Sequence, residues 1–258
     1  MWAGHCTQVS AACGQDAVDV VGFTDRAHSD GGDALAAGVA GLAVGALIGG
    51  AGSYYLEKQK QNAEDSARFA AYGTDIDRAT GEYNRTTSAA RNAQGCYQKE
   101  FQTLVQLRKT RRISDTEGRA RFNEIVSGIS EANALMAAVD QRLGESLNTY
   151  TQAYEEDLKK TGVERQAVTR AARSSKPVAV AGSSAKPAST EAAVNTERKV
   201  QQASTARTES KAVSSGLTAQ LKSFCSNPDV GDWGSGASAC GKAPESAWNP
   251  PLPGTEAT

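Results

Sequence analysis

Large apolar side chains are scarce in this sequence. Aromatic residues make up 6% of the 258 residues, and the hydrophobic residues as a whole make up 39%. Long stretches are instead dominated by alanine, serine, threonine, glutamine and glutamate. Such a chain forms solvated helices or disorder more readily than a large packed interior, so we expect a mainly α protein and no sizeable globular core.

An excess of charge of one sign is also missing. The chain has 28 basic and 29 acidic residues and a net charge of -1, and it contains no block of five like charges. Binding to nucleic acid normally needs a basic patch or stripe. We therefore expect no nucleic-acid partner.

Motifs that carry catalysis or bind metal are absent as well. Its two histidines, His5 and His28, lie in an N-terminal segment without periodicity, and no G-x-S-x-G, CxxC or HxxxH pattern occurs. Without these spacings nothing organises a nucleophile, its base or a zinc site. We expect no catalytic residues, no metal site, no cofactor and no enzymatic activity.

Two features could be mistaken for such sites. Gly236 to Ala243 (GASACGKA) nearly matches a phosphate-binding loop, but Ala243 replaces the Ser or Thr that would hold magnesium and no apolar strand precedes it. A nucleotide-binding enzyme is therefore the least favoured hypothesis. Glu155, Glu156 and Asp157 cluster in the sequence, and we interpret them as a solvated helix face.

The N-terminal segment, residues 1–33, lacks the apolar stretch of a standard signal peptide. Ser10 to Cys13 (SAAC) nevertheless looks like a bacterial lipoprotein cleavage site. A start site placed too far downstream would account for both observations, so a signal sequence missing from this end is one hypothesis.

One uncharged run, Ala34 to Leu56, is long enough to span a bilayer, which takes about 20 residues. Its many glycines and alanines make insertion of a single copy marginal. A row of small residues lies along one helix face, a spacing by which helices associate in lipid: Ala37, Gly41, Gly45 and Gly49. We predict a membrane helix that forms homo-oligomers, with Tyr54 and Tyr55 at the interface. A flexible linker and a buried soluble hairpin are the alternatives.

The run from Gly38 to Gly52 resembles the glycine-zipper segments of bacterial cell-envelope proteins, many of them lipoproteins. The resemblance covers only about residues 34–56. It implies an envelope location and association between helices, and it implies no activity.

Residues 57–173 carry two heptad seams, which are typical of coiled coils. The first seam runs from Phe69 to Leu104 and the second from Phe122 to Tyr154. Between them, Ser114 and Glu117 form a capping box that predicts a helix start. We predict an antiparallel helical hairpin with its turn near 112–115, and two intermolecular coiled coils are the alternative. Cys96, beside the first seam, is expected to be a small core residue.

The rest of the chain is predicted to be less ordered. Residues 174–189 read as a Ser/Ala/Pro linker in which Pro177 and Pro187 stop helices. Residues 190–224 could form a third helix, and residues 225–258 read as a disordered Pro/Gly-rich tail. Cys225 and Cys240 could close a disulfide in an oxidising compartment or remain free thiols.

A basic cluster lies where the hairpin should turn. Arg108, Arg111 and Arg112 could contact an envelope protein partner or an acidic surface, or could merely complement the helix dipole. Overall we predict a non-enzymatic structural or scaffolding protein of the bacterial cell envelope. It would be membrane-associated, with its helical body in the periplasm, although the lysines after Leu56 favour the opposite orientation. A hairpin adaptor of an envelope transport assembly is the alternative.

Overall fold

The computed structural model describes residues 50–174 and 186–241 of the chain. Within these two ranges every regular element is helical and no strand occurs, which confirms the mainly α prediction. The elements are α3 (Gly50–Gln61), α4 (Asp65–Lys109), α5 (Asp115–Lys160), α6 (Arg165–Arg173), α7 (Pro187–Cys225), the 3-10 helix η1 (Pro228–Gly236) and α8 (Ser238–Gly241). All four residues of the predicted zipper face lie outside the described ranges: Ala37, Gly41, Gly45 and Gly49.

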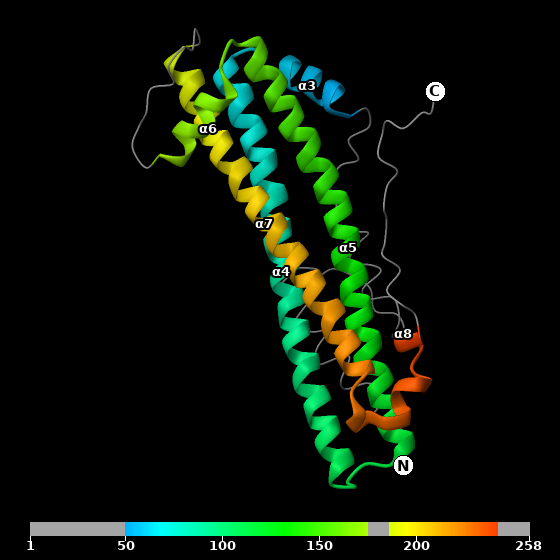
Figure 1. Ribbon diagram of the computed structural model, residues 1–258. Helices are drawn as coiled ribbons and strands as arrows, with labels where there is room; N and C mark the ends of the chain where they lie inside the picture. The colour runs from blue at the N-terminus through cyan, green and yellow to red at the C-terminus, as the bar shows by residue number, and fades with distance from the viewer. Residues whose placement is uncertain (1–49, 175–185, 242–258) are drawn as a thin grey trace, which may run out of the picture.

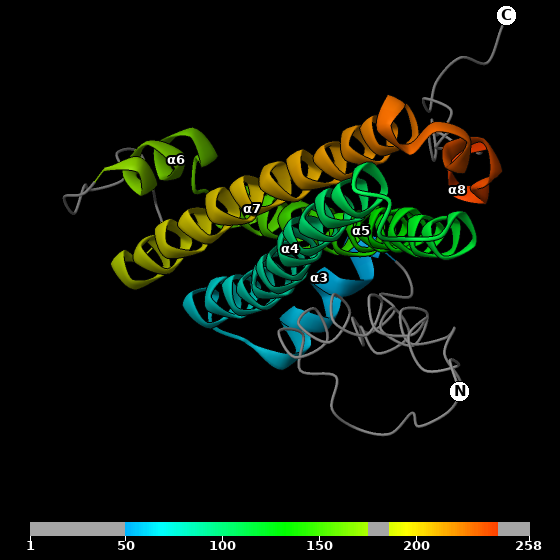
Figure 2. The ribbon, with the colours of Figure 1, turned by 90° about the horizontal axis from the view of Figure 1, so that it is seen from below.

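Three long helices, α4, α5 and α7, lie side by side along the molecule (Figure 1). Helix α5 runs against α4, and α7 runs in the same direction as α4. Figure 2 shows α6 at one end of this bundle and α8 at the other. We call the end that carries α3 and α6 the α3 end, and the end where α4 turns into α5 the tip.

Every residue of the two predicted seams is buried. The seams meet across α4 and α5 as expected from steps of three and four residues, which keep the apolar side chains on one helix face. Aromatic contacts mark both ends of the bundle: Phe69 packs edge-on against Tyr154 at the α3 end, and Phe101 stacks on Phe224 at the tip. Alanine and threonine fill many of the positions between these clusters.

The two-helix arrangement predicted for residues 57–173 is incomplete, because α7 packs against both α4 and α5. The seams are thin, so a third helix is needed to cover them, and α7 buries Val213, Leu217 and Phe224 there. Pro187 does not stop a helix as predicted but begins α7. A proline fits the first helical turn because the amide hydrogen it lacks would have no partner there.

The prediction that Tyr54 and Tyr55 lie at a membrane interface is wrong. They sit on α3, 4% and 2% exposed, and pack into the core of the α3 end. No helix within the described residues is long and apolar enough to cross a membrane. The predicted segment 34–56 therefore ends within the folded bundle, and its first part, residues 34–49, lies outside the description.

The prediction of a disordered tail is also wrong for residues 225–241. Helix η1 and the short α8 fold back onto the ends of the three long helices. Trp233, 1% exposed, anchors this segment in the tip core. The composition was misleading because Trp233, with Val230 and Ala237, buries the apolar area that the surrounding glycines and serines lack.

Candidate functional site

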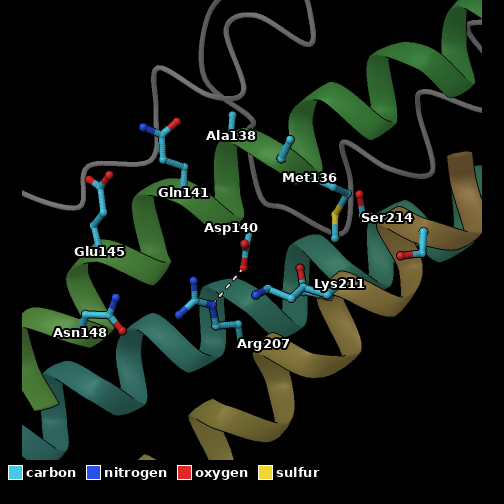
Figure 3. A pocket seen from close by; sticks show the side chains of 12 residues that line it. Met136, Ala138, Asp140, Gln141, Glu145, Asn148, Arg207, Lys211 and Ser214 are labelled. Atoms are coloured by element: carbon cyan, nitrogen blue, oxygen red, sulfur yellow. Dashed lines mark hydrogen bonds and ion pairs between the residues drawn. The ribbon is translucent and has the colours of Figure 1, made fainter. Parts of the chain in front are cut away.

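A groove of about 750 Å³ lies between α5 and α7 (Figure 3). Most of the residues that line it have polar side chains. Helix α5 contributes Met136, Ala137, Ala138, Asp140, Gln141, Glu145 and Asn148, and α7 contributes Arg207, Ser210, Lys211, Ser214 and Ser215.

An ion pair joins the two walls of this groove. The Arg207 Nε lies 3.2 Å from Asp140 Oδ1, and the Tyr83 hydroxyl from α4 donates to the same carboxylate at 3.2 Å. Burial, and then the nearby Asp140 carboxylate, raise the pKa of Tyr83, so this hydroxyl stays a donor. Arg207 can approach because residue 144 is glycine: a Cβ there would lie 2.7 Å from Arg207 Nη2. Asp140 of α5 thus links all three long helices through Tyr83 and Arg207.

The groove offers little for covalent chemistry. The Ser214 hydroxyl lies 2.8 Å from Asn133 Oδ1, and neither histidine of the sequence falls in the described ranges, so no serine–histidine pair occurs in this part of the chain. The same described residues contain no cluster of three or more metal-binding side chains. The Asp140–Arg207 ion pair supports packing of the helices, and the groove has room for a small polar molecule.

A second polar site is buried at the α3 end. Arg68 of α4 contacts Asp157 of α5 in a two-point ion pair, with Nε–Oδ2 at 2.9 Å and Nη2–Oδ1 at 3.1 Å. The same guanidinium donates to the carbonyls of Asn62 and Ala63 just after α3. Asp157 is fully buried, and its hydrogen bonds raise the pKa of Arg68 above its usual range.

The interpretation of Glu155, Glu156 and Asp157 as one solvated face is therefore wrong for Asp157. Glu156 pairs with Lys160 at the surface, and Glu155 pairs with Arg165 at the start of α6. Consecutive helix residues point in directions about 100° apart, so one of three adjacent carboxylates can face the core while the others face water. Sequence reasoning missed the partner because Arg68 lies 89 residues away.

At the tip, Arg108 is used within the fold. Its guanidinium lies 4.2 Å from the centre of the Trp233 ring and donates to the Asp229 carbonyl and to Asp232, each at 3.3 Å. The indole in turn donates to Asp115 at 3.2 Å. Residue 118 has to be glycine for this packing, since a Cβ there would lie 2.2 Å from the ring. Arg108 therefore fastens η1 to α4, and its predicted contact with a partner stays a prediction.

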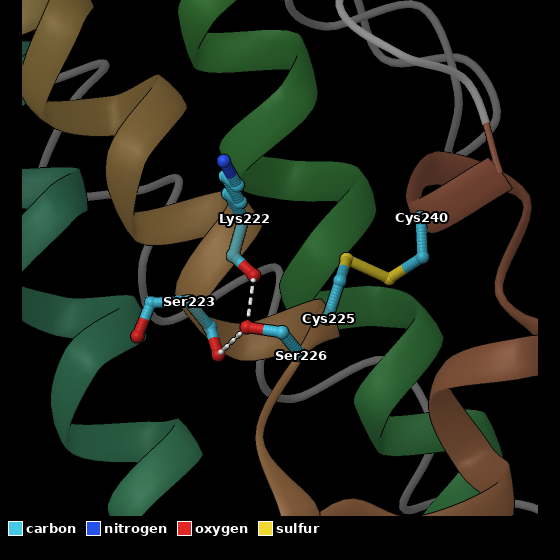
Figure 4. Close-up of a disulfide and its surroundings, with 5 residues drawn as sticks. All are labelled: Lys222, Ser223, Cys225, Ser226 and Cys240. Atoms are coloured by element: carbon cyan, nitrogen blue, oxygen red, sulfur yellow. Dashed lines mark hydrogen bonds between the residues drawn. A yellow bond between two sulfur atoms is a disulfide. The ribbon is translucent and has the colours of Figure 1, made fainter.

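A covalent bond reinforces the same end. Cys225, the last residue of α7, is joined to Cys240 of α8 by a disulfide with a Cα–Cα distance of 5.5 Å (Figure 4). The next residue, Ser226, closes the helix with a hydroxyl that donates to the Lys222 carbonyl at 2.9 Å. The sequence left this pairing open. Cys96 packs against the tip core as expected for a small residue there, and it is disulfide-bonded as well.

The near-match to a phosphate-binding loop falls in this disulfide-closed segment. Gly236 ends η1, residues 238–241 form the single turn of α8, and Cys240 within that turn is held by Cys225. A phosphate-binding loop needs free backbone amides between a strand and a following helix. Here a 3-10 helix precedes the motif, which argues against that use.

The turn between α4 and α5 begins with a tight helix ending. The Arg112 amide donates to the Leu107 carbonyl at 2.9 Å, and the Arg111 amide donates to the Arg108 carbonyl at 3.0 Å. These two bonds define a Schellman motif, in which the residue at the position of Arg111 is left-handed. Arg111 has φ 54°, a conformation that costs a non-glycine residue about 1–2 kcal/mol. After the turn, Ser114 accepts from the Glu117 amide, which confirms the predicted cap.

Helix α5 ends in the same motif with the usual residue. The Val163 amide donates to the Leu158 carbonyl and the Gly162 amide to the Lys159 carbonyl, at 2.9 and 3.3 Å. Gly162 has φ 70° and needs no strain to adopt it. The side chains of Arg111 and Arg112 are exposed and make no hydrogen bond or ion pair with the described residues.

No protein family, curated protein sequence or solved structure matches this chain.

Proposed function

We propose that this chain is a non-enzymatic structural protein of the bacterial cell envelope. In this proposal the three-helix bundle is a rigid spacer, and the glycine-zipper segment before α3 attaches it and drives homo-oligomerisation. The observation that carries the proposal is that the long helices are fastened to one another at both ends. Helix α4 alone has 45 residues, and at 1.5 Å per residue this gives a span of about 68 Å.

The form of the attachment follows from the position of α3. Helix α3 begins at Gly50 and packs into the bundle core through Tyr54 and Tyr55, so in this proposal residues 34–49 are the part of the segment that meets the membrane. That length is below the roughly 20 residues of a single span. We therefore favour membrane association through several packed copies of the zipper face over a lone transmembrane helix.

The disulfides support an oxidising compartment. Cys96, Cys225 and Cys240 are all bonded, whereas cytosolic thiols are normally kept reduced. A periplasmic bundle fits this chemistry better than the orientation favoured by the lysines that follow Leu56. The polar groove between α5 and α7 supports the non-enzymatic reading, because Asp140 and Arg207 neutralise each other there.

Replacement of Gly45 by leucine tests the attachment. The bulky side chain would block close approach along the zipper face, so membrane-extracted protein should lose its cross-linked oligomer. Gly52→Leu is the matched control, since residue 52 is exposed on α3 with open space around it. An oligomer that survives Gly45→Leu, or is lost equally in both variants, would rule out the zipper contact.

The compartment is tested by trapping thiols in intact cells. After acid quenching and alkylation, peptide mapping should recover Cys225 and Cys240 in one disulfide-linked peptide pair. Recovery of both residues as alkylated thiols would contradict the periplasmic location.

A further inference from the structure

The α4–α5 turn places an arginine in a left-handed backbone conformation that favours glycine. Arg111 and Gly162 occupy equivalent positions in two Schellman motifs, both left-handed, yet only Gly162 is suited to that conformation. Glycine at position 111 would form the same two hydrogen bonds with less strain. The fold therefore does not explain why arginine stands there.

Arg111 and Arg112 differ from the other basic side chains near the turn because they have no acidic partner among the described residues. Other basic side chains near the turn have acidic partners: Arg108 and Arg119 pair with Asp232, Lys109 with Asp229, and Arg121 with Glu117. Asp115 is occupied by the Trp233 indole. Arg111 and Arg112 thus face solvent, and neither side chain pairs with a carboxylate in the described part of the chain.

We propose that Arg111 and Arg112 form a docking site for an acidic segment of a partner protein. A guanidinium presents a planar fork of donors that matches a carboxylate at two points. Strain retained at an exposed position is typical of residues kept for contact with a ligand. Docking at this site would give the adaptor hypothesis its contact surface, and it can be measured whatever the compartment or oligomeric state.

An anionic membrane surface fits this turn less well. Leu56 is the one large hydrophobic side chain exposed among the described residues, and it lies on α3, at the opposite end of the bundle. The turn therefore lacks an apolar side chain to insert into lipid. Two basic residues alone add only about fivefold each to the affinity for an anionic bilayer.

Poly-L-glutamate serves as the acidic probe, and vesicles with phosphatidylglycerol serve as the lipid probe, both against the full chain at low salt. Arg111→Glu with Arg112→Glu should weaken poly-L-glutamate binding at least tenfold. Arg78→Glu is the control, because Arg78 is exposed but paired with Asp75, and it should change binding less than twofold. Equal losses in both variants, or binding to the vesicles alone, would overturn the proposal.

Arg111→Gly separates the role of the side chain from folding. This variant should raise the Tm by about 2–4 °C, as expected for relief of a strained residue in a chain of this size, while it weakens poly-L-glutamate binding. Gly162→Ala should do the reverse, lowering the Tm and leaving binding unchanged. An Arg111→Gly variant that binds as well as the original chain would contradict the assigned role of Arg111.

Discussion

The two ends of the bundle are held together by different interactions. The α3 end buries its central charges, with Asp157 fully enclosed and paired with Arg68, and surrounds them with tyrosines. The tip keeps its ion pairs at the surface, on Asp229 and Asp232, and adds a disulfide and a buried indole.

This difference has energetic consequences. Surface ion pairs contribute about 0–1 kcal/mol each and weaken in salt, whereas breaking a buried pair is far more costly. The α3 end should therefore resist salt but tolerate no change in its polar pair. The tip depends instead on the packing of Trp233 and on the disulfide between Cys225 and Cys240. The side chains of Arg111 and Arg112 form no hydrogen bond or ion pair with the described residues.

Removal of the buried carboxylate should have the largest effect. Asp157→Ala removes the buried two-point partner of Arg68 and leaves this guanidinium only the half-exposed Asp65 carboxylate, which should lower the free energy of unfolding by about 3 kcal/mol. Urea denaturation measures this change. Glu156→Ala, which removes only the surface pair with Lys160, is the control and should cost less than about 1 kcal/mol. Similar losses in the two variants would show that the ion pair of the α3 end is not buried.

Disturbing the packing of the Trp233 indole at the tip should have the second-largest effect on stability. Gly118→Ala places a Cβ against the Trp233 ring and should cost about 1–3 kcal/mol through overpacking. Gly81→Ala is the matched control, since no atom lies within 4 Å of a Cβ built there. That variant should gain up to about 1 kcal/mol from helix propensity. A stabilised Gly118→Ala would mean that Trp233 does not occupy this slot.

Alkaline pH should lower the stability of the two ends by smaller amounts, through their buried tyrosines. Burial raises the pKa of Tyr97, the shifted tyrosine nearest the tip, to about 12. Between pH 10 and 12 the unfolded chain loses this proton while the folded chain keeps it, so stability falls as pH rises. The slope is about 1.4 kcal/mol per pH unit for one group.

Tyr97→Phe should therefore flatten the fall in stability between pH 10 and 12, as measured by urea denaturation across that range. The tyrosines of the α3 end, whose pKa values burial also raises, should keep the remaining slope. Parallel curves for the variant and the original chain would contradict the shift at Tyr97.

The long helices could be predicted because their signals are local. Steps of three and four residues place the seam from Phe69 to Leu104 on one face, and that face is buried. Ser114 caps α5 as its spacing with Glu117 predicted. Only part of the capping box forms, because the Glu117 carboxylate pairs with Arg121 instead.

The missed features depend on contacts between distant residues. Nothing near Asp157 in the sequence indicates Arg68, and nothing near Trp233 indicates the glycine at 118 that receives it. Tyr54 and Tyr55 were misplaced because an apolar residue at the end of an uncharged run suits either a membrane interface or a protein core. Whether such a residue is buried depends on the part of the protein that packs against it. Local composition does not reveal which part that is.

The distance between the two ends of the bundle tests the spacer most directly. Spin labels introduced at Arg78 on α4 and Thr116 on α5, through unnatural amino acids that spare the cysteines, can be measured by double electron–electron resonance. The rise of 1.5 Å per residue predicts a separation of about 45 Å. A single narrow distribution near that value is expected from a rigid bundle, and a broad distribution or several distances would contradict it.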